Sequence, residues 1–389
     1  AKVQQIYNCY NVHFNGCLPI QMIFITSNWV YAIFFVSLPH QLSIGTMTRV
    51  SIIIPVHNVE EYIAECLESV IAQTYDHGMI ECILVDDCTP DHSMDVARHV
   101  FEGYHGAMTI KMLKHETNSG LSASRNTGIE AASGDFLFFV DSDDRLYPET
   151  LQVLTEQLKV HPDADLIVGN WYDETRACNN YCHTQPFCSN DANYLFLGNT
   201  KKITAWNSLI RRSIITHHNL RFVVGMYFED VPFNYQLYSR IGKYIIIPNT
   251  TYFYRKNISG IMSSGRSSKC NKTIHDYCLM LHIMVKNLHQ KLYVGKSNII
   301  FFYLLIAEDF INTHYKDIKD ISHVRRYLRH VINIMMKRHL KNMRIFMAAE
   351  LSLCYYLKVL KWGVVRRNIN KFTRICYLPA MALNGLHKQ

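Results

Sequence analysis

The chain has 389 residues, of which 49% are hydrophobic and 19% charged, so it can bury a large core and is not globally disordered. Its formal net charge of +8 fits anionic partners such as nucleotides, phospholipid headgroups or nucleic acid. The 12 scattered cysteines exclude a small disulfide-stapled scaffold and favour a reducing, cytoplasmic setting. A chain of this length accommodates one large α/β domain with an appendage.

Residues 1–46 do not share the pattern of the rest of the chain. The apolar run at 18–38 approaches the length of a bilayer span, but polar residues interrupt it and no cluster of Lys or Arg sets an orientation. A membrane anchor and a signal peptide stay open as alternatives. Because TRVSIIIPVHN directly after Met47 is typical of a protein start, we interpret residues 1–46 as a poorly defined extension without a fold.

Residues 47–264 alternate between strand and helix patterns. Short apolar, β-branched runs predict buried strands at 50–56, 80–85, 110–113 and 136–140. Helical spacing of apolar residues predicts helices between them, at 62–73, 91–101 and 122–132. This alternation is typical of βαβ units, so we expect an α/β domain with a mainly parallel sheet flanked by helices. Ligands of such sheets bind beyond the carboxyl ends of the strands.

Acidic residues follow two of the predicted strands at the point where each strand ends. Asp86 and Asp87 follow the strand at 80–85, while Asp141 and Asp143 follow the strand at 136–140. Aspartate is a common turn residue, but two acidic groups at one sheet edge repel each other unless a cation lies between them. Mg²⁺ and Mn²⁺ bind one or two carboxylates together with phosphate oxygens and water. The pattern thus predicts a divalent metal at Asp141 and Asp143.

Phosphate binding is predicted at residues 120–128. The chain has neither a GxxxxGK[ST] run nor a GxGxxG run after a strand, which argues against a P-loop ATPase and a Rossmann dehydrogenase. The segment GLSASRNTG leads into a helix and offers backbone N–H donors and the guanidinium of Arg125, both suited to a diphosphate. An ordinary glycine turn with a helix cap is the alternative interpretation.

Four residues in the stretch after the second acidic cluster have side chains that can bind zinc. Their spacing matches no established zinc pattern, so unpaired loop cysteines are the interpretation that we favour over a metal site. They are Cys178, Cys182, His183 and Cys188.

Residues 265–389 show helical periodicity with few strand or turn signals, and their second half is strongly basic with interleaved aromatic residues. This composition predicts amphipathic helices on an anionic membrane, so we expect a cytoplasmic protein in peripheral contact with the inner face of the plasma membrane. Solvent-facing basic helices are the simplest alternative, and a nucleic-acid surface is disfavoured because no reading motif is recognisable. The basic residues are Arg325, Arg326, Arg329, Lys337, Arg338, Lys341, Arg344, Lys358, Lys361, Arg366, Arg367, Lys371 and Arg374.

Six segments between about residues 49 and 264 carry a family resemblance. They are SIIIPVHNVEEYIAECLESVIAQTY, ILVDDCTPDHS, NSGLSASRNTGIEAASGDFLFFVDSDD, AWNSLIRRS, GMYFEDVPF and YFYRKNISGIMSS. In this order and spacing they resemble the inverting family 2 glycosyltransferases of the GT-A fold, particularly the bacterial enzymes that build surface polysaccharides. The resemblance implies a GT-A-like nucleotide-sugar-binding domain at 47–264, and the composition of residues 265–389 predicts a helical, basic appendage.

The resemblance also implies which residues bind the donor. The loop that packs on the base and ribose matches Pro55, Val56, His57, Asn58 and Glu61. The aspartate that reads the uracil edge matches Asp86, with Asp87 as its neighbour, and the donor-binding turn matches Arg125 and Asn126. The segment that closes over the diphosphate or acceptor matches Tyr254 and Arg255.

The catalytic residues implied by the resemblance fit the chemistry of sugar transfer. Asp143 and Asp141 match the metal and ribose pair, and Asp230 matches the general base, with Glu229 as its alternate. A metal and Arg125 would stabilise the departing diphosphate, and a carboxylate would take the proton of the attacking acceptor hydroxyl. One in-line displacement inverts the anomeric centre. A helix N-cap is the alternative role for Glu229 and Asp230.

We therefore expect a metal-dependent inverting hexosyltransferase that uses Mn²⁺ or Mg²⁺ and a nucleotide sugar, with UDP as the favoured nucleotide. It would add one sugar to a glycan or lipid-linked glycan in cell-surface polysaccharide biosynthesis, because the Gln/Arg-x-x-Arg-Trp signature of processive synthases is absent. Cys88-Thr89 replaces the family's glycine-serine after Asp87. A nucleotidyltransferase and a catalytically silent nucleotide-sugar-binding module stay open as alternatives; the sequence specifies neither the sugar nor the acceptor.

Overall fold

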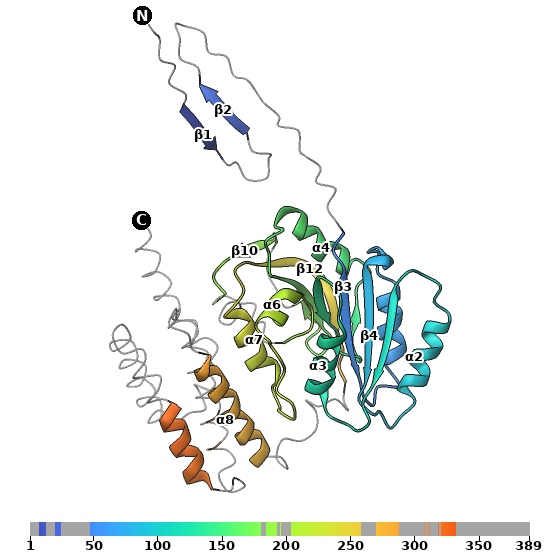
Figure 1. Ribbon diagram of the computed structural model, residues 1–389, viewed down its shortest axis with the longest axis vertical. Coiled ribbons are helices and arrows are strands. Elements are labelled where there is room, and N and C mark those ends of the chain that lie inside the picture. The colour runs from blue at the N-terminus through green and yellow to red at the C-terminus, as the bar shows by residue number, and fades with distance from the viewer. Residues whose placement is uncertain are drawn as a thin grey trace, which may run out of the picture. The chain divides into compact units, whose positions relative to one another are not determined.

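A computed structural model describes residues 8–12, 20–24, 47–179, 184–192, 195, 204–257, 270–287, 307, 311, 318 and 320–331 (Figure 1). The chain divides into two compact units, Ala1–Thr46 and Met47–Gln389. In the first unit, β1 (Asn8–Val12) and β2 (Ile20–Phe24) form an antiparallel pair, in a segment for which the sequence predicts no fold. Among the described residues, no helix is long and apolar enough to cross a membrane.

The second unit is built on a 10-stranded sheet in the order β10-β12-β8-β11-β6-β3-β4-β5, in which β7 also pairs with β12 and β9 with β8. The strands are β3 (Val50–Val56), β4 (Ile80–Asp86), β5 (Thr109–Lys114), β6 (Phe136–Phe139), β7 (Arg145–Leu146), β8 (Leu166–Asp173), β9 (Cys178–Asn179), β10 (Phe187–Ser189), β11 (Ser208–Arg211) and β12 (Tyr244–Tyr254). The helices are α1 (Ile63–Ile71), η1 (His77–Met79), α2 (Ser93–Glu102), α3 (Leu121–Ala131), α4 (Thr150–Val160), α6 (Arg212–His217), α7 (Asp230–Tyr238) and α8 (Cys270–Lys286).

The predicted α/β architecture is confirmed. β6, β3, β4 and β5 are mutually parallel, as the βαβ pattern predicts. The other half of the sheet is mixed: β12 is parallel to β8, whereas β11 runs antiparallel to both β6 and β8. The short strands β9 and β10 lie between β8 and β11 in the sequence, and alternation of short apolar runs does not reveal the reversed direction of β11.

The central strands are buried on both faces, which explains their continuous apolar sequences. Successive residues of β3 enter two different cores: Ile53 packs with α3 and α7, whereas Ile52 and Ile54 pack with α1, α2 and α4. Helix α3 approaches β3 closely at Gly128, where an added Cβ would lie 2.3 Å from Cγ2 of Ile53. This contact holds the second half of α3 directly against the middle of β3.

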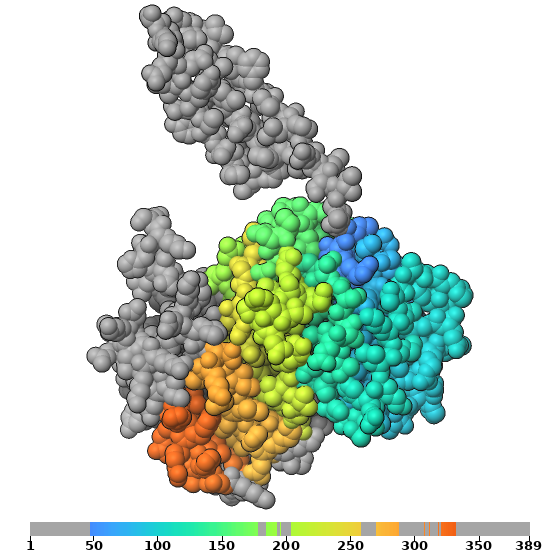
Figure 2. Space-filling view, viewed as in Figure 1, coloured from blue at the N-terminus to red at the C-terminus, as the bar shows by residue number. Residues whose placement is uncertain are grey.

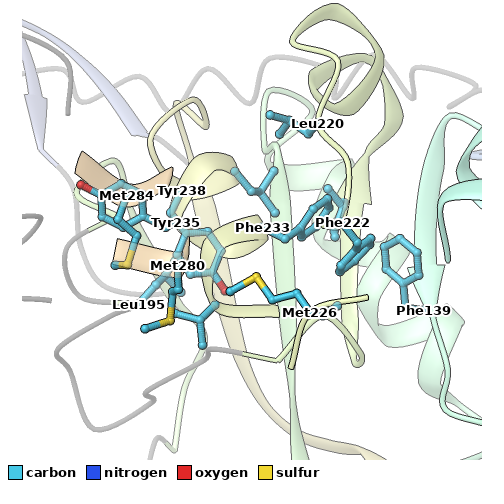
Figure 3. Packing of buried hydrophobic residues seen from close by; sticks show 14 of the residues in the cluster. Phe139, Leu195, Leu220, Phe222, Met226, Phe233, Tyr235, Tyr238, Met280 and Met284 are labelled. Atoms are coloured by element: carbon cyan, nitrogen blue, oxygen red, sulfur yellow. The ribbon is translucent and has the colours of Figure 1, made fainter. Parts of the chain in front are cut away.

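The core of this unit continues into α8. Met280 and Met284 are buried against Tyr235 and Tyr238 of α7, and Figure 3 shows these side chains facing one another beside Leu195. The helix at 321–331 joins the same core. Figure 2 shows the surface of α8 directly beside that of residues around 220–240. The segment that the sequence assigns to a separate appendage thus begins with a helix that shares the core of the sheet domain.

Candidate active site

The loops after β3 and β4 are joined at the carboxyl ends of the strands. The backbone N–H of Asp87 donates to the carbonyl of Val56 at 3.0 Å, and that of Asn58 donates to Oγ1 of Thr89 at 2.8 Å. Asn58 is in the left-handed region with φ 54°. Across the same edge, Nδ2 of Asn118 lies 3.0 Å from Nε2 of His57. His57, Asn58 and Asn118 are all exposed, so this edge presents polar groups to a ligand.

Three of the other residues predicted for base and ribose binding are placed differently. Pro55 and Val56 are inside β3 with buried side chains, so the loop that a nucleotide can reach begins at His57. Glu61 is exposed in the turn before α1. Its neighbour Glu60 makes the contacts between loops, because its carboxylate accepts from the backbone N–H of His92 at 2.9 Å.

Asp86 and Asp87 have different environments. The carboxylate of Asp87 accepts from the backbone N–H groups of Ser119 and Gly120 at 2.8 and 2.7 Å and lies 2.8 Å from Nδ1 of His115. It therefore holds the turn before α3 rather than pointing to a ligand. Asp86 accepts at Oδ1 from the backbone N–H of Thr89, and its Oδ2 lies 3.7 Å from Nζ of the exposed Lys114. Both side chains are buried, and Asp86 is the member of the pair whose carboxylate makes fewer contacts within the chain.

Arg125 gathers three carboxylates from distant parts of the chain. Its Nη1 donates to Oε1 of Glu229 and Oδ1 of Asp230, and its Nη2 donates to Oδ1 of Asp141, each at 2.8 Å. The side chain is only 1% exposed, and its guanidinium lies 5.2 Å from the centroid of the Phe222 ring. Burial lowers the pKa of Arg125, but Asp230, Asp141 and Glu229 raise it by more, so the guanidinium stays charged.

These contacts correct the expected roles of Arg125 and Asn126. A buried guanidinium that already binds three carboxylates organises the site and does not lie open to a diphosphate. Asn126 likewise binds within the chain: it donates to the carbonyl of Phe222 and accepts from the N–H of Phe222, both at 2.9 Å. Both residues connect α3 to residues 222–230, about a hundred positions away in the sequence. Local sequence patterns cannot indicate such a contact.

Glu229 and Asp230 begin α7 but do not cap it. No side-chain capping bond is formed at Glu229, and both carboxylates turn to Arg125, so the capping alternative is wrong. The preceding Phe228 has φ 62°, a strained conformation for an aromatic residue that directs the next two side chains to the guanidinium. Burial raises the pKa of Asp230 to about 7, with Glu229 and Asp141 adding to the rise and Arg125 opposing it.

The acidic run after β6 contains one residue that sequence reasoning missed. Asp144 is buried and accepts at Oδ2 from the hydroxyl of Tyr252 and at Oδ1 from the backbone N–H of Arg255, both at 2.8 Å. The same tyrosine hydroxyl accepts from the backbone N–H of Asp141 at 3.1 Å. Asp144 thus anchors the loop that carries Asp141 and Asp143.

Tyr254 and Arg255 lie beside this loop, as their predicted association with the site requires. The Nε of Arg255 donates to the carbonyl of Asp143 at 2.8 Å, and its Nη2 pairs with Glu65. Tyr254 stacks on Trp206, with ring centroids 5.6 Å apart. Trp206 is not among the predicted site residues; its indole also stacks on Tyr252, with ring centroids 4.5 Å apart.

Asp141 and Asp143 have the electrostatic surroundings of a cation site. Burial raises the pKa of Asp143, and the charge of Asp141 raises it further. Nδ2 of Asn257 donates to Oδ2 of Asp143 at 2.8 Å, while Asp141 uses only its Oδ1 for Arg125. Within the described ranges, no three His, Cys, Asp or Glu side chains converge to hold a metal by themselves. A carboxylate pair of this kind suits a Mg²⁺ or Mn²⁺ ion that is also bound by phosphate oxygens.

Two other sequence predictions fall largely beyond the described part of the chain. Of the four residues considered for zinc, Cys182 and His183 lie outside the described residues, as does the side chain of Cys178, while Cys188 is free and exposed. Of the basic residues in the C-terminal region, Arg325, Arg326 and Arg329 are described and exposed on the helix at 321–331. The basic residues from Lys337 onward lie outside the described ranges.

The fold and the convergent carboxylates define an α/β domain of the nucleotide-sugar-binding class. Residues 51–218 match the model of the family described as "Glycosyl transferase family 2". The predicted resemblance to this family is therefore confirmed for residues 51–218.

Relatives and solved structures agree with this assignment. The chain is 33% identical over 219 residues to the uncharacterized glycosyltransferase EpsJ of Bacillus subtilis, a match that covers 54% of this chain and 61% of EpsJ. The fold is similar to that of TarS from Staphylococcus aureus in complex with UDP-GlcNAc, with a TM-score of 0.56, 20% identity, and coverage of 75% and 81% of the two chains. It is also similar to the mannosyltransferase PcManGT of Pyrobaculum calidifontis in complex with GDP-Man and Mn²⁺, with a TM-score of 0.51, 14% identity, and coverage of 86% and 87%.

Proposed function

We propose that this protein transfers one sugar from a nucleotide sugar to a glycan or lipid-linked glycan acceptor, with inversion at the anomeric carbon. The observation that carries the proposal is the convergence of Asp141, Glu229 and Asp230 on buried Arg125, at the sheet edge where Asp86 also lies. The proposal is supported by the shared contact of Asp230, the candidate base, and Asp141, a candidate metal residue, with one guanidinium in a chain whose residues 51–218 match the family 2 glycosyltransferases.

The donor is held at the carboxyl ends of β3 and β4. His57, Asn58 and Asp86 offer polar side chains to a base and ribose. An aspartate at this position suits the N–H edge of uracil, because a carboxylate accepts and does not donate. The similarity of the fold to TarS, whose structure contains UDP-GlcNAc, supports a UDP-sugar as the donor.

Metal dependence is part of the proposal. Asp143 and Asp141 would hold Mg²⁺ or Mn²⁺. When bound, such an ion supplies positive charge that stabilises the departing diphosphate. The raised pKa of Asp143, caused by burial and by the nearby Asp141, marks a site where bound positive charge is favoured.

Asp230 is the proposed general base, with Glu229 as its alternate. Its carboxylate would accept the proton of an acceptor hydroxyl as that oxygen attacks the anomeric carbon. Arg125 holds the carboxylate in place through Oδ1. Because one base supports one in-line displacement, the proposed product has the inverted configuration.

The transfer rate is expected to fall as the pH is lowered through about 7. The base acts only when it is deprotonated, and burial raises the pKa of Asp230 to about 7. The rate at saturating substrate should therefore decline about tenfold per pH unit well below that value. A pH profile of kcat between pH 5 and 9 checks this expectation, and a rate independent of pH over that range would contradict the role of Asp230.

A panel of UDP-, GDP- and dTDP-sugars, with manganese and then with EDTA, tests the proposed function. We expect turnover of a UDP-sugar, and we expect EDTA to abolish it. The transfer rate of Asp143→Ala should be at least about 100-fold lower than that of the wild type, because the negative charge of the transition state loses its neutralising cation. The control is Asp163→Ala, since Asp163 is exposed and pairs with Lys243 away from the carboxyl strand ends. Full activity of Asp143→Ala would contradict the metal-dependent mechanism, and no turnover or nucleotide binding across the panel would favour a silent binding module.

The acceptor and the cellular location are proposed from charge. The exposed face of the helix at 321–331 is basic, because it carries Arg325, Arg326 and Arg329. A basic face suits contact with anionic lipid at the membrane where lipid-linked glycans are built. Binding to vesicles containing anionic lipid at low salt, compared with neutral vesicles, measures that contact. An absence of binding to either would remove the peripheral-membrane proposal.

A further inference from the structure

The turn that leads to Glu229 and Asp230 is held by α8. Asp276 of α8 accepts at Oδ2 from the backbone N–H of Tyr227 at 2.9 Å. Nζ of Lys272 donates to the same oxygen at 2.6 Å and to the carbonyl of Gly225 at 2.5 Å. The same ammonium lies 4.3 Å from the centroid of the Tyr227 ring. Lys272 and Asp276, one turn apart on α8, thus hold the carbonyl of Gly225 and the N–H and ring of Tyr227.

Asp276 is placed as a buried anchor. The residue is 2% exposed, and its other oxygen, Oδ1, lies 3.2 Å from Nδ1 of His275. Burial of a carboxylate is costly unless charge partners and hydrogen-bond donors compensate it. Its partners here are Lys272 and the Tyr227 N–H, so the compensation of this buried charge depends on the conformation of the turn.

Helix α8 also supports the strained residue next to the proposed base. Phe228 has φ 62°, a conformation that is strained for a residue other than glycine and persists only when its surroundings hold it. The ring of Phe228 stacks on Tyr277 of α8, with centroids 5.1 Å apart and planes 14° from parallel. The stacking of Phe228 on Tyr277 and the hydrogen bond that the N–H of Tyr227 donates to Asp276 restrain two successive residues of the turn.

We propose that Asp276, together with Tyr277, is a positioning residue for Asp230, so that α8 is part of the catalytic unit. This inference rests on the proposed function, in which Asp230 is the base. Asp276 lies outside the segment at 51–218 that the family model matches, and the sequence alone assigned its helix to the appendage. Its loss would allow the turn to relax and would move Asp230 from its place at Arg125, while the donor-binding loops after β3 and β4 would be unaffected.

The test compares Asp276→Ala with Asp165→Ala in the full chain. Asp165 is a matched control, because it also accepts from one backbone N–H, that of Gly242, and pairs with one cation, Arg211, but precedes β8 at the opposite end of the sheet from the site. For Asp276→Ala we expect kcat to fall by about 10- to 100-fold with an unchanged Kd for UDP, since a small misplacement of a catalytic group is costly. Hydrogen–deuterium exchange should rise in residues 223–230, and Asp165→Ala should show neither change.

Lys272→Gln is the second variant and covers the case in which Asp276→Ala does not fold. Lys272 is partly exposed, so its replacement leaves the buried core intact. We expect faster exchange in residues 223–230 and a smaller fall in kcat. Unchanged exchange and kcat in the variant that folds would overturn the inference. If Asp230→Asn remains fully active, the proposed base is wrong; if Asp230→Asn is inactive but Asp276→Ala and Lys272→Gln match the wild type, only the positioning role is wrong.

Discussion

Replacement of Asp230 by asparagine is expected to lower kcat by about 10²- to 10⁴-fold, because an amide of the same shape cannot accept the proton of the acceptor hydroxyl. The side chain keeps an oxygen that can still accept from Nη1 of Arg125, so the fold should be retained. Binding of UDP should also be unchanged, since the nucleotide site lies at the ends of β3 and β4. Steady-state transfer kinetics and calorimetric titration with UDP measure the two effects separately.

Glu229→Gln is the matched control for this variant. Glu229 is adjacent to Asp230 in the sequence, and its carboxylate accepts from the same nitrogen of Arg125 at the same distance of 2.8 Å. We expect the Gln variant to retain a much larger share of the activity than Asp230→Asn. The reverse order would assign the base to Glu229, and wild-type activity in both variants would remove the base from this cluster.

Replacement of Arg125 by methionine is expected to destabilise the protein by about 3–5 kcal/mol, as the removal of one partner from a buried ion cluster does. Asp141, Glu229 and Asp230 would be left close together with no cation among them. Glu229 and Asp141 already raise the pKa of Asp230, and the loss of Arg125 removes the charge that opposes this rise, so protonation of Asp230 at lower pH relieves the repulsion. The loss of stability should therefore be larger at pH 7 than at pH 5, and urea unfolding at both pH values measures it.

The control for Arg125→Met is Arg98→Met. Arg98 pairs with Asp95 on α2, but both side chains are more than half exposed. A solvent-exposed pair of this kind contributes about 0–1 kcal/mol, so the control should unfold near the wild-type urea concentration at both pH values. An equal effect of the two substitutions would show that the three carboxylates do not depend on Arg125.

Local sequence patterns predict the parallel half of the domain because each of its strands has an apolar pattern that can be recognised without knowing its partners. The run at 50–56 is mostly apolar and β-branched, and it forms β3 with these bounds. The same logic places Asp86, Asp141 and Asp143 at strand ends, since parallel strands carry their carboxyl ends to one edge. The short strands β7, β9 and β10 have two or three residues each and carry too little periodicity to be recognised.

The parts of the site that were missed depend on contacts between distant residues. Arg125 binds Glu229 across 104 positions, and Tyr252 binds Asp144 across 108. The sequence shows an arginine within a helix pattern and a tyrosine within a strand pattern, both of which are ordinary. The only sequence signal for a buried Arg125 is the number of carboxylates at the predicted sheet edge. These carboxylates need a cation from within the chain in addition to a metal ion.

The anomeric configuration of the product tests the central claim most directly, because it reports the number of displacements at the reacting carbon. The measurement is the proton NMR spectrum of the glycoside formed from the sugar nucleotide that the panel identifies. The arrangement of one base, Asp230, at a metal and nucleotide edge predicts a configuration opposite to that of the donor. A product that retains the configuration of the donor would contradict the single-displacement mechanism.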